Sequence, residues 1–271
     1  MQYIDCKSYA QEILDEVKAI PNKKKLVIIT VGEDEASKVY VRGKIKDAEY
    51  CGIPVEHIQI EDNWCAGVTL LDTIEKNNND DEVCGIILQL PLPKHMNDEE
   101  VRYCEMIAPW KDVDGLTHDS YFEPCTPKGI MYLLEKELGD LTGKSALVIG
   151  RSDLVGKPLA KMLLDKDCTV TVAHSKTFIG DLQRGLRYAD IVISAVGEAN
   201  LIDLKMCEFA DIVVDVGINR SANGKLCGDC YNFKEGHGHW KAPKVTPVPG
   251  GVGLLTRAML MKNVALASEY T

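Results

Sequence analysis

The chain has no apolar run near the ~20 residues that a membrane-spanning helix needs. It also has no excess of basic residues, because 31 Lys and Arg stand against 41 Asp and Glu, for a formal net charge of -10. Nucleic-acid phosphates are normally bound by a basic face, so nucleic acid is not expected as a partner. The first residues show neither the apolar core of a secretory signal nor the Arg-rich pattern of a transit peptide. We therefore expect a cytoplasmic protein without a membrane partner.

The 10 cysteines show no spacing typical of a disulfide framework, which favours reduced thiols. Cys227 and Cys230 are the exception, since they form a C-x-x-C pair with His237 and His239 close behind. This arrangement is also found in redox pairs and in half of a zinc site. Because no second C-x-x-C pair completes a zinc set, we expect no metal ion.

Short β-branched runs alternate with helical stretches, which predicts an α/β fold with parallel strands and crossover helices. The runs are apolar on both faces, as in strands covered by helices on both sides. The predicted strands are residues 26–31, 55–60 and 83–90, followed by 145–150, 168–173, 191–195 and 212–216. Turn-rich segments at 109–115 and 124–127 separate the two sets, so we place a domain boundary near residue 118. A helical tail follows at 255–268.

The segment around residue 40 predicts an amphipathic helix. The residues expected to face the core are Val41, Ile45 and Ala48. Ser37, Tyr40 and Lys44 then share an adjoining stripe, where an aromatic ring lies one turn from a titratable amine. Such a stripe suits a planar substrate and a proton transfer, although the same pair also occurs on solvated helix flanks. Gly43 costs about 1 kcal/mol relative to Ala inside a helix, which indicates close approach of another group, such as a ligand.

A glycine turn links the predicted strand at 145–149 to a helix at 159–164. Such a turn points backbone N–H groups and the positive end of the helix dipole at an anion. The glycine spacing is not G-x-G-x-x-G, so an ordinary strand-to-helix turn is the alternative. At the end of the next strand the chain has no carboxylate where an NAD site commonly has one, which favours NADP. The residues suited to a 2′-phosphate there are Arg151, His174, Ser175 and Lys176.

Several separated segments, taken together and in order, resemble the bifunctional methylenetetrahydrofolate dehydrogenase/cyclohydrolase family over essentially the whole chain. They are Ser37-x-x-Tyr40-Val-x-x-Lys44, Gly85-Ile-Ile-Leu-Gln89-Leu-Pro-Leu-Pro93, Lys111-Asp-Val-Asp114-Gly115, Pro124-Cys-Thr-Pro-Lys-Gly129, Gly150-Arg-Ser-x-x-Val-Gly-Lys-Pro158, His174-Ser-Lys-Thr177, Asp215-Val-Gly-Ile-Asn219 and Pro247-Val-Pro-Gly-Gly-Val-Gly253. Any one of these segments could arise by chance, whereas the collinear set is very specific.

The resemblance implies an N-terminal three-layer α/β domain at residues 1–118 and a Rossmann-type NADP-binding domain with a parallel sheet at 119–254. It also implies a cleft between them, a C-terminal helix at 255–271 that packs back on the first domain, and a homodimer. The implied activity is NADP-dependent oxidation of methylenetetrahydrofolate to the methenyl form, followed by hydrolysis to formyltetrahydrofolate. Tetrahydrofolate derivatives are the implied ligands, and one-carbon metabolism with purine biosynthesis is the implied setting.

The resemblance also assigns residue roles. Tyr40 would stack on the folate ring system, Lys44 would be the catalytic amine, Gln89 would orient Lys44, and Asp114 would hold the pterin. The other implied substrate-binding residues are Val41, Arg42, Gly43, Leu88, Leu90, Pro249, Gly250, Gly251, Val252 and Gly253. The implied NADP-binding residues are Gly150, Arg151, Ser152, His174, Ser175 and Ile218. Without the resemblance, Gln89 is as readily a strand cap and Asp114 an Asx-turn residue.

The two implied steps need different groups. Loss of a hydride leaves a cation delocalised over two nitrogens, so oxidation needs alignment more than a base. Hydrolysis needs a base, and a lysine with an ordinary pKa of about 10.4 is a poor one unless its charged form is disfavoured. A methenyl cation bound beside Lys44 would disfavour that form, so we hypothesise that Lys44 is the base of the hydrolysis.

Two segments depart from the family pattern. Leu254 and Leu255 stand where the family usually has Pro and Met, and Gly228-Asp-Cys230-Tyr replaces the usual Gly-Asp-Val-Asp. Three alternatives to a bifunctional enzyme follow from the sequence. They are a dehydrogenase with little cyclohydrolase activity, a nucleotide-binding regulator without turnover, and a relative of the amino-acid or shikimate dehydrogenases.

Overall fold

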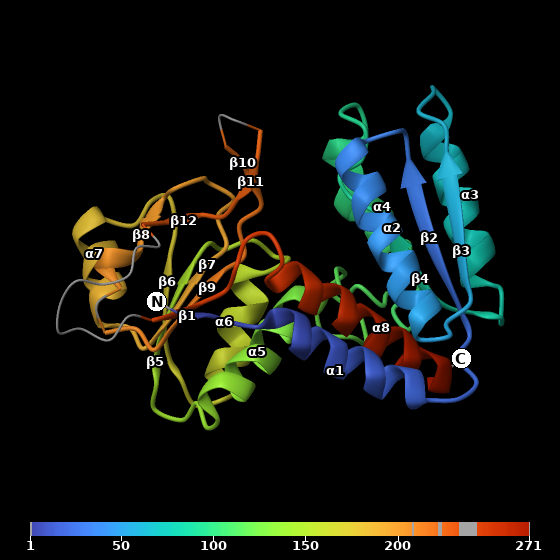
Figure 1. Cartoon of the computed structure of the whole chain (residues 1–271). Coiled ribbons are helices and arrows are strands. Elements are labelled where there is room, and N and C mark those ends of the chain that lie inside the picture. Colours follow the sequence, from blue (N-terminus) through green and yellow to red (C-terminus); the bar gives the residue numbers. More distant parts are fainter. Residues whose placement is uncertain (1, 208, 222–223, 233–242, 271) are drawn as a thin grey trace. The chain divides into compact units, whose positions relative to one another are not determined.

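A computed structural model describes residues 2–207, 209–221, 224–232 and 243–270 (Figure 1). The chain forms two compact units. The three-stranded unit consists of Gln11–Cys125 and Arg257–Thr271, and the six-stranded unit consists of Met1–Ala10 and Thr126–Thr256. The division therefore falls at Cys125, a few residues beyond the boundary expected near residue 118, and the first ten residues group with the six-stranded unit.

The three-stranded unit is built on a parallel sheet in the order β3-β2-β4. Its strands are β2 (Lys25–Val31), β3 (Val55–Ile60) and β4 (Val83–Leu88). Its helices are α2 (Glu35–Tyr50), α3 (Ala66–Asn78), α4 (Glu100–Glu105) and the short 3₁₀ helix η1 (Asn97–Glu99), together with most of α1 (Cys6–Ala19) and α8 (Val252–Tyr270). The predicted strand at 83–90 thus ends at Leu88.

Helices cover both faces of this sheet. On one face Val27 and Ile29 pack in a core cluster with Leu70 and Ile74 of α3. On the other face the Cys84 thiol lies 3.6 Å from a backbone carbonyl oxygen of α8. The layers are therefore helix, sheet and helix, as the three-layer expectation requires.

The six-stranded unit has a parallel sheet in the order β1-β13-β9-β7-β5-β6. Its strands are β1 (Gln2–Tyr3), β5 (Ser145–Ile149), β6 (Thr169–Ala173), β7 (Ile191–Ser194), β9 (Ile212–Asp215) and β13 (Lys244–Val245). Its helices include α5 (Cys125–Leu138), α6 (Gly156–Leu164), α7 (Ile179–Tyr188) and the 3₁₀ helix η2 (Leu204–Met206). Two small sheets pair β8 (Ile202–Asp203) with β12 (Cys230–Tyr231) and β10 (Asn219–Arg220) with β11 (Leu226–Cys227).

The strand order reverses at β5. The chain passes from β5 to β6 on one side and then to β7 on the other side of β5. In open parallel α/β sheets, ligands bind beyond the carboxyl ends of the strands at such a switch point. The glycine turn after β5 and the loop after β7 therefore lie where a ligand is expected in this unit.

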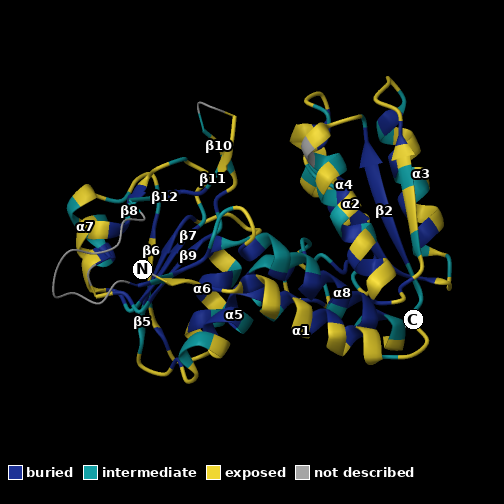
Figure 2. Cartoon of the chain, viewed as in Figure 1, coloured by how far each residue is buried: buried dark blue, intermediate teal, exposed yellow. Residues whose placement is uncertain are grey.

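Two expectations from the sequence are wrong in detail. The runs at β3 and β6 are not covered on both faces, since most of their residues are at least partly exposed (Figure 2). The turn-rich stretch at 124–127 is also not a simple junction, because α5 begins at Cys125. Pro127 lies in the first turn of α5, where a missing N–H costs no helical hydrogen bond.

Local chemistry sets the ends of α2, the helix predicted around residue 40. The Asp34 carboxylate accepts a hydrogen bond from the Ser37 backbone N–H at 2.7 Å, so Asp34 is the N-cap. Gly52 follows the C-cap with a φ of +67°, a conformation that glycine adopts readily. In the described ranges, the helices are all too short or too polar to cross a membrane.

Candidate active site

Lys44, which is buried, and Asp114, which is partly buried, form an ion pair in the three-stranded unit. The Lys44 Nζ lies 3.4 Å from Asp114 Oδ2, and the two side chains are 7% and 18% exposed. Tyr40 precedes Lys44 by one turn of α2 and is half-buried, and this burial raises the pKa of its phenol. The structure thus brings together the predicted amine and the predicted pterin-binding carboxylate.

The loop that carries Asp114 is held by a different carboxylate. Asp112 accepts hydrogen bonds from the Gly115 N–H at 3.2 Å, the Thr117 N–H at 2.9 Å and the Thr117 hydroxyl at 2.8 Å. The turn-stabilising role considered for Asp114 therefore belongs to Asp112, whose burial raises the pKa of its carboxyl group. This leaves the Asp114 side chain to Lys44.

Sequence reasoning did not find three further supports of this loop. The buried Lys111 ammonium donates to the backbone oxygens of Asn77 at 3.0 Å and Asp80 at 2.8 Å. The Asn263 amide of α8 donates to the Val113 backbone oxygen at 2.9 Å. Lys111 belongs to a segment that carried the family resemblance, but its partners are more than thirty residues away in sequence. No local pattern could have identified them.

Gln89 directly follows β4. Its amide nitrogen donates to the Leu90 backbone oxygen at 2.7 Å, while its Oε1 is buried with no hydrogen-bond partner in the described part of the chain. The Ser37 hydroxyl oxygen is in the same situation. Lys44 itself bonds to Asp114. The Gln89 carbonyl oxygen and the Ser37 hydroxyl therefore retain hydrogen-bonding capacity for a bound molecule.

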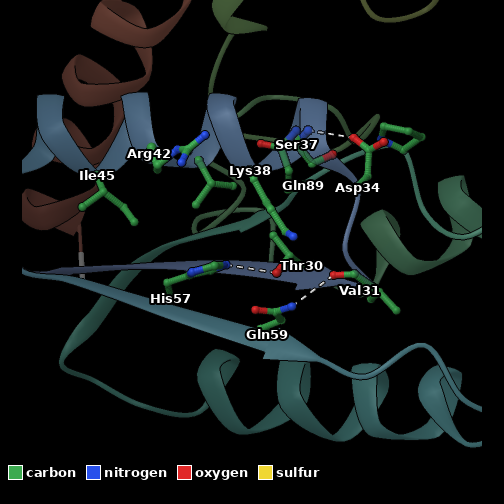
Figure 3. A pocket seen from close by; sticks show the side chains of 13 residues that line it. Thr30, Val31, Asp34, Ser37, Lys38, Arg42, Ile45, His57, Gln59 and Gln89 are labelled. Atoms are coloured by element: carbon green, nitrogen blue, oxygen red, sulfur yellow. Dashed lines mark hydrogen bonds between the residues drawn. The ribbon is translucent and has the colours of Figure 1, made fainter.

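Both groups line a cavity of about 190 Å³ in the three-stranded unit (Figure 3). Val41 and Arg42, two of the predicted substrate-binding residues, line it as well. Its wall on β2 and β3 is polar: Thr30 Oγ1 lies 3.0 Å from His57 Nε2, as the dashed line in Figure 3 marks. Leu88, at the end of β4, and Leu90 do not line this cavity: Leu88 belongs to the core cluster of the three-stranded unit, and the partly buried Leu90 packs against that cluster.

The space beside Gly43 is already filled. A Cβ atom on Gly43 would lie 2.0 Å from Arg257 Nη1 of α8. The Arg257 Nε in turn lies 2.8 Å from Asp47 Oδ2, one turn further along α2. The absence of a side chain at Gly43 therefore makes room for the Arg257 guanidinium group. This corrects the expectation that Gly43 makes room for a ligand. Burial raises the pKa of Asp47, and the charge of Arg257 opposes that rise.

In the six-stranded unit the glycine turn after β5 is tightly packed. Gly150 has a φ of +119°, and a Cβ atom there would lie 2.3 Å from the Ala195 backbone oxygen. A Cβ atom on Gly156 would lie 2.3 Å from the Gly150 backbone oxygen. Ser152 accepts the Val155 N–H at 3.2 Å just before α6. Only glycine fits these two positions. Without side chains there, another group can approach the backbone of the turn closely.

The other predicted cofactor residues follow neighbouring strands of this sheet. His174 and Ser175 follow β6, where the Lys176 N–H donates to His174 Nδ1 at 3.1 Å. Ile218, which follows β9, is 53% exposed, and Arg151, in the turn after β5, is exposed. These residues therefore occupy loops at the carboxyl edge of one parallel sheet.

The predicted glycine loop 249–253 leads into α8. Gly250 has a φ of +94°, and a Cβ atom on Gly251 would lie 2.2 Å from the Pro247 backbone oxygen. Pro249 is exposed. The last two residues of the predicted loop, Val252 and Gly253, already belong to the first turn of α8.

The departure at Leu254 and Leu255 has a packing role. Leu255 is fully buried, and a Cβ atom on Gly129 would lie 3.0 Å from its Cβ. The Leu255 side chain thus packs between the start of α8 and the start of α5.

The C-x-x-C pair is divided between two short strands. Cys227 lies on β11 and Cys230 on β12, and all ten cysteines are free thiols. Burial raises the pKa of Cys230. His237 and His239 lie outside the described residues. In the described ranges, no three Cys, His, Asp or Glu side chains are arranged to hold a metal ion.

A parallel sheet with a glycine turn at its switch point, in a chain whose other unit holds a lysine–aspartate pair, is typical of nucleotide-dependent α/β enzymes. The chain belongs to the tetrahydrofolate dehydrogenase/cyclohydrolase family. The family's catalytic-domain model matches residues 4–114, and its NAD(P)-binding-domain model matches residues 124–271. The predicted family and the predicted fold class are both confirmed.

Individual relatives agree with this assignment. The chain is 43% identical over 277 residues to the bifunctional protein FolD of Magnetococcus marinus, covering 96% of this chain and 94% of the relative. The crystal structure of the FolD methylenetetrahydrofolate dehydrogenase/cyclohydrolase of Campylobacter jejuni has a TM-score of 0.86 at 37% identity and covers 98% of both chains. The Trypanosoma brucei FolD structure, solved with NADP and an inhibitor, has a TM-score of 0.87 at 30% identity and covers 99% of this chain and 97% of that one.

Proposed function

We propose that this chain is a bifunctional enzyme of one-carbon metabolism. It oxidises methylenetetrahydrofolate with NADP⁺ and hydrolyses the resulting methenyl form to formyltetrahydrofolate. The observation that carries this proposal is the ion pair of Lys44 and Asp114, within a chain that matches both family domains. A regulator without turnover would not need a titratable amine held in this way.

In the proposed hydrolysis, Lys44 is the base. A water molecule attacks the cationic methenyl carbon while the Lys44 amine takes one of its protons, which gives a neutral carbinolamine. One carbon–nitrogen bond then breaks, the departing nitrogen takes up a proton, and the formyl group remains on the other nitrogen. The net result is the release of one proton. A positive charge on the substrate disfavours an ammonium beside it, so the methenyl cation itself promotes the free amine.

The neighbouring residues have supporting roles in this proposal. Tyr40 stacks on the folate ring system, which suits its half-buried ring one turn from Lys44. Asp114 pairs with the Lys44 ammonium before the substrate binds, and it accepts N–H groups of the pterin once the substrate is bound. Gln89 offers its unpaired carbonyl oxygen to Lys44 or to the attacking water. The proposed substrate contacts also include Val41 and Arg42, Leu88 and Leu90, and the backbone of the loop 249–253.

The six-stranded unit suits NADP. The turn at Gly150 has no space for side chains, and the adjacent Arg151 and Ser152 are exposed, so backbone and polar groups can meet a diphosphate. His174 and Ser175 stand where NAD sites commonly carry a carboxylate, which favours the 2′-phosphate of NADP. Ile218 offers an apolar surface at the end of β9. When bound, NADP⁺ supplies the acceptor for the hydride of the first step.

The setting of the enzyme is also a proposal. Ten free cysteines suit a reducing compartment, and we infer a cytoplasmic location. A homodimer and a supply of formyl groups to purine biosynthesis are inferred from family membership.

A monofunctional dehydrogenase is the main alternative, and a coupled assay separates the two. Methylenetetrahydrofolate is mixed with NADP⁺ or NAD⁺, and the reduced nucleotide and methenyltetrahydrofolate are followed together. We expect NADPH to form without lasting build-up of the methenyl form, and NADP⁺ to be preferred over NAD⁺. Stoichiometric build-up of methenyltetrahydrofolate would show a dehydrogenase alone.

A further inference from the structure

Asp229 is a buried carboxylate that the proposed chemistry does not use. It is fully buried, and its two oxygens accept five hydrogen bonds. Three of the donors are successive backbone N–H groups, those of Val196 at 3.0 Å, Gly197 at 3.3 Å and Glu198 at 3.0 Å. Asp229 therefore binds the loop after β7 much as a bound anion would, with its charge satisfied by backbone dipoles.

The same carboxylate holds two further segments. The Ser194 hydroxyl, at the end of β7, donates to it at 2.9 Å. The Asn219 side-chain amide, next to the proposed NADP contact Ile218, also donates at 2.9 Å. A Cβ atom on Gly217 would lie 2.0 Å from Asp229 Oδ1, so glycine is required there for the carboxylate to enter. Asp229 thus joins the loops that follow β7 and β9.

A second aspartate fixes the backbone of Asp229. The buried Asp215 carboxylate, at the end of β9, accepts the N–H groups of Asp229 at 3.0 Å and of Cys230 at 2.9 Å. A Cβ atom on Gly228 would lie 2.0 Å from Asp215 Oδ2. The two carboxylates and the two glycines therefore interlock, and the Asp229 side chain has little freedom to move.

The location gives this arrangement its significance. The loop after β7 lies at the switch point of the sheet, beside the glycine turn that follows β5. Gly150 of that turn packs directly against the Ala195 backbone, one residue before the N–H groups that Asp229 binds. A ligand at the switch point would meet both loops. The shape of that site depends on the loop that Asp229 holds.

We propose that Asp229 is a positioning residue for NADP binding, which rests on the proposed use of NADP by this unit. Asp229 does not touch the cofactor. It holds the loop 196–198 and the segment around Ile218 in the shape that receives the cofactor. A carboxylate is needed because both of its oxygens accept N–H groups, whereas an asparagine would turn an NH₂ group toward at least one of those donors.

The test is the pair of variants Asp229→Asn and Asn219→Ala, with Asp203→Asn as control. Asp203 is in the same unit and accepts the Lys205 N–H, so the control removes a local capping carboxylate. Three quantities are measured for each: the KM for NADP⁺ and the kcat of the dehydrogenase reaction, and the rate of methenyltetrahydrofolate hydrolysis without nucleotide. We expect Asp229→Asn to raise the KM for NADP⁺ about 10- to 100-fold, since it removes hydrogen bonds to a charged group. Hydrolysis should stay within about twofold, because the Lys44 site lies in the other unit.

The remaining outcomes are decisive as well. Asn219→Ala removes only one of the donors, so a smaller rise in KM, with the protein folded, supports the proposal even if Asp229→Asn does not fold. An unchanged KM for NADP⁺ in both variants overturns it. Equal loss of both activities in a folded variant also overturns it, because that is the mark of a general structural role. Absence of NADP⁺ reduction by the unmodified protein would instead count against the proposed function itself.

Discussion

The two units present their proposed functional groups in different ways. The three-stranded unit offers side chains: a lysine on α2 and an aspartate on a nearby loop, paired at 3.4 Å. The six-stranded unit offers backbone: a glycine turn after β5 and a loop after β7, both at the carboxyl edge of the sheet. A side-chain site depends on a few residue types at the right places. A backbone site depends on loop shape, and hence on buried groups elsewhere that hold the loops.

The largest effect that separates the two units is expected for Lys44→Met. Methenyltetrahydrofolate hydrolysis should fall about 100-fold or more, the usual contribution of a general base. Dehydrogenation should fall far less, because hydride loss needs alignment rather than a base. The control is Lys46→Met, which replaces an exposed lysine of the same helix. Full hydrolysis by Lys44→Met would remove Lys44 from the mechanism.

The backbone site is tested by Gly150→Ala. The added Cβ would meet the Ala195 oxygen at 2.3 Å and the backbone would be strained at a φ of +119°. We expect the KM for NADP⁺ to rise about tenfold or more, since strain of this kind costs about 1–3 kcal/mol. Nucleotide-free hydrolysis should be retained.

Gly143→Ala is the matched control for that variant. Gly143 also has a positive φ, of +76°, but its Cβ would meet nothing within 4 Å. If both variants raise the KM for NADP⁺ equally, the contact with Ala195 is not what shapes the site.

A third experiment concerns the packing of α2 in the three-stranded unit. Gly43→Ala alone would push the Arg257 guanidinium away from its place beside Asp47. In an Arg257→Ala background the same change meets no such obstacle and should gain about 1 kcal/mol of stability from helix propensity. Urea unfolding of both single variants and the double variant measures the coupling. Additive changes would show that Arg257 does not occupy the space beside Gly43.

The smallest expected effect is a pH dependence that comes from His57, in the wall of the cavity. Burial lowers the pKa of His57 below its ordinary value. The unfolded chain then binds a proton more readily than the folded one, so stability is complete above about pH 6.5 and declines as the pH falls below it. The decline should be slight because His57 is largely exposed. His57→Gln should remove it in urea unfolding between pH 5 and pH 7.5, and an unchanged slope would rule out His57 as its source.

Much of this could be predicted from the sequence, for reasons that differ between the units. The strands β2, β4 and β5 were predictable because their apolar runs are buried on both faces. The two-residue strands β1 and β13 were not, because β1 forms by pairing with β13, and β13 by pairing with β9, in each case far away in sequence. The helix α5 was missed because its first turn carries a proline, a residue that also marks turns.

The functional groups divide in the same way. Tyr40 and Lys44 were suggested as site residues by their residue types and helical spacing, whereas Asp114 was assigned only through the resemblance to the family. The roles of Asp112 and Asp229 were not predicted. The sequence alone does not distinguish a buried aspartate that binds backbone N–H groups from one exposed to solvent. The reason for Gly43 was misjudged, because the guanidinium that fills its space comes from residue 257.

The most direct test of the division between the units is one progress curve with Lys44→Met, methylenetetrahydrofolate and NADP⁺. NADPH and methenyltetrahydrofolate are followed together until the substrate is used up. With the backbone site intact and the base removed, we predict that the two products rise one for one and that the methenyl form persists beyond its slow uncatalysed decay. NADPH formation without methenyl build-up would contradict the account, because hydrolysis would then proceed without Lys44.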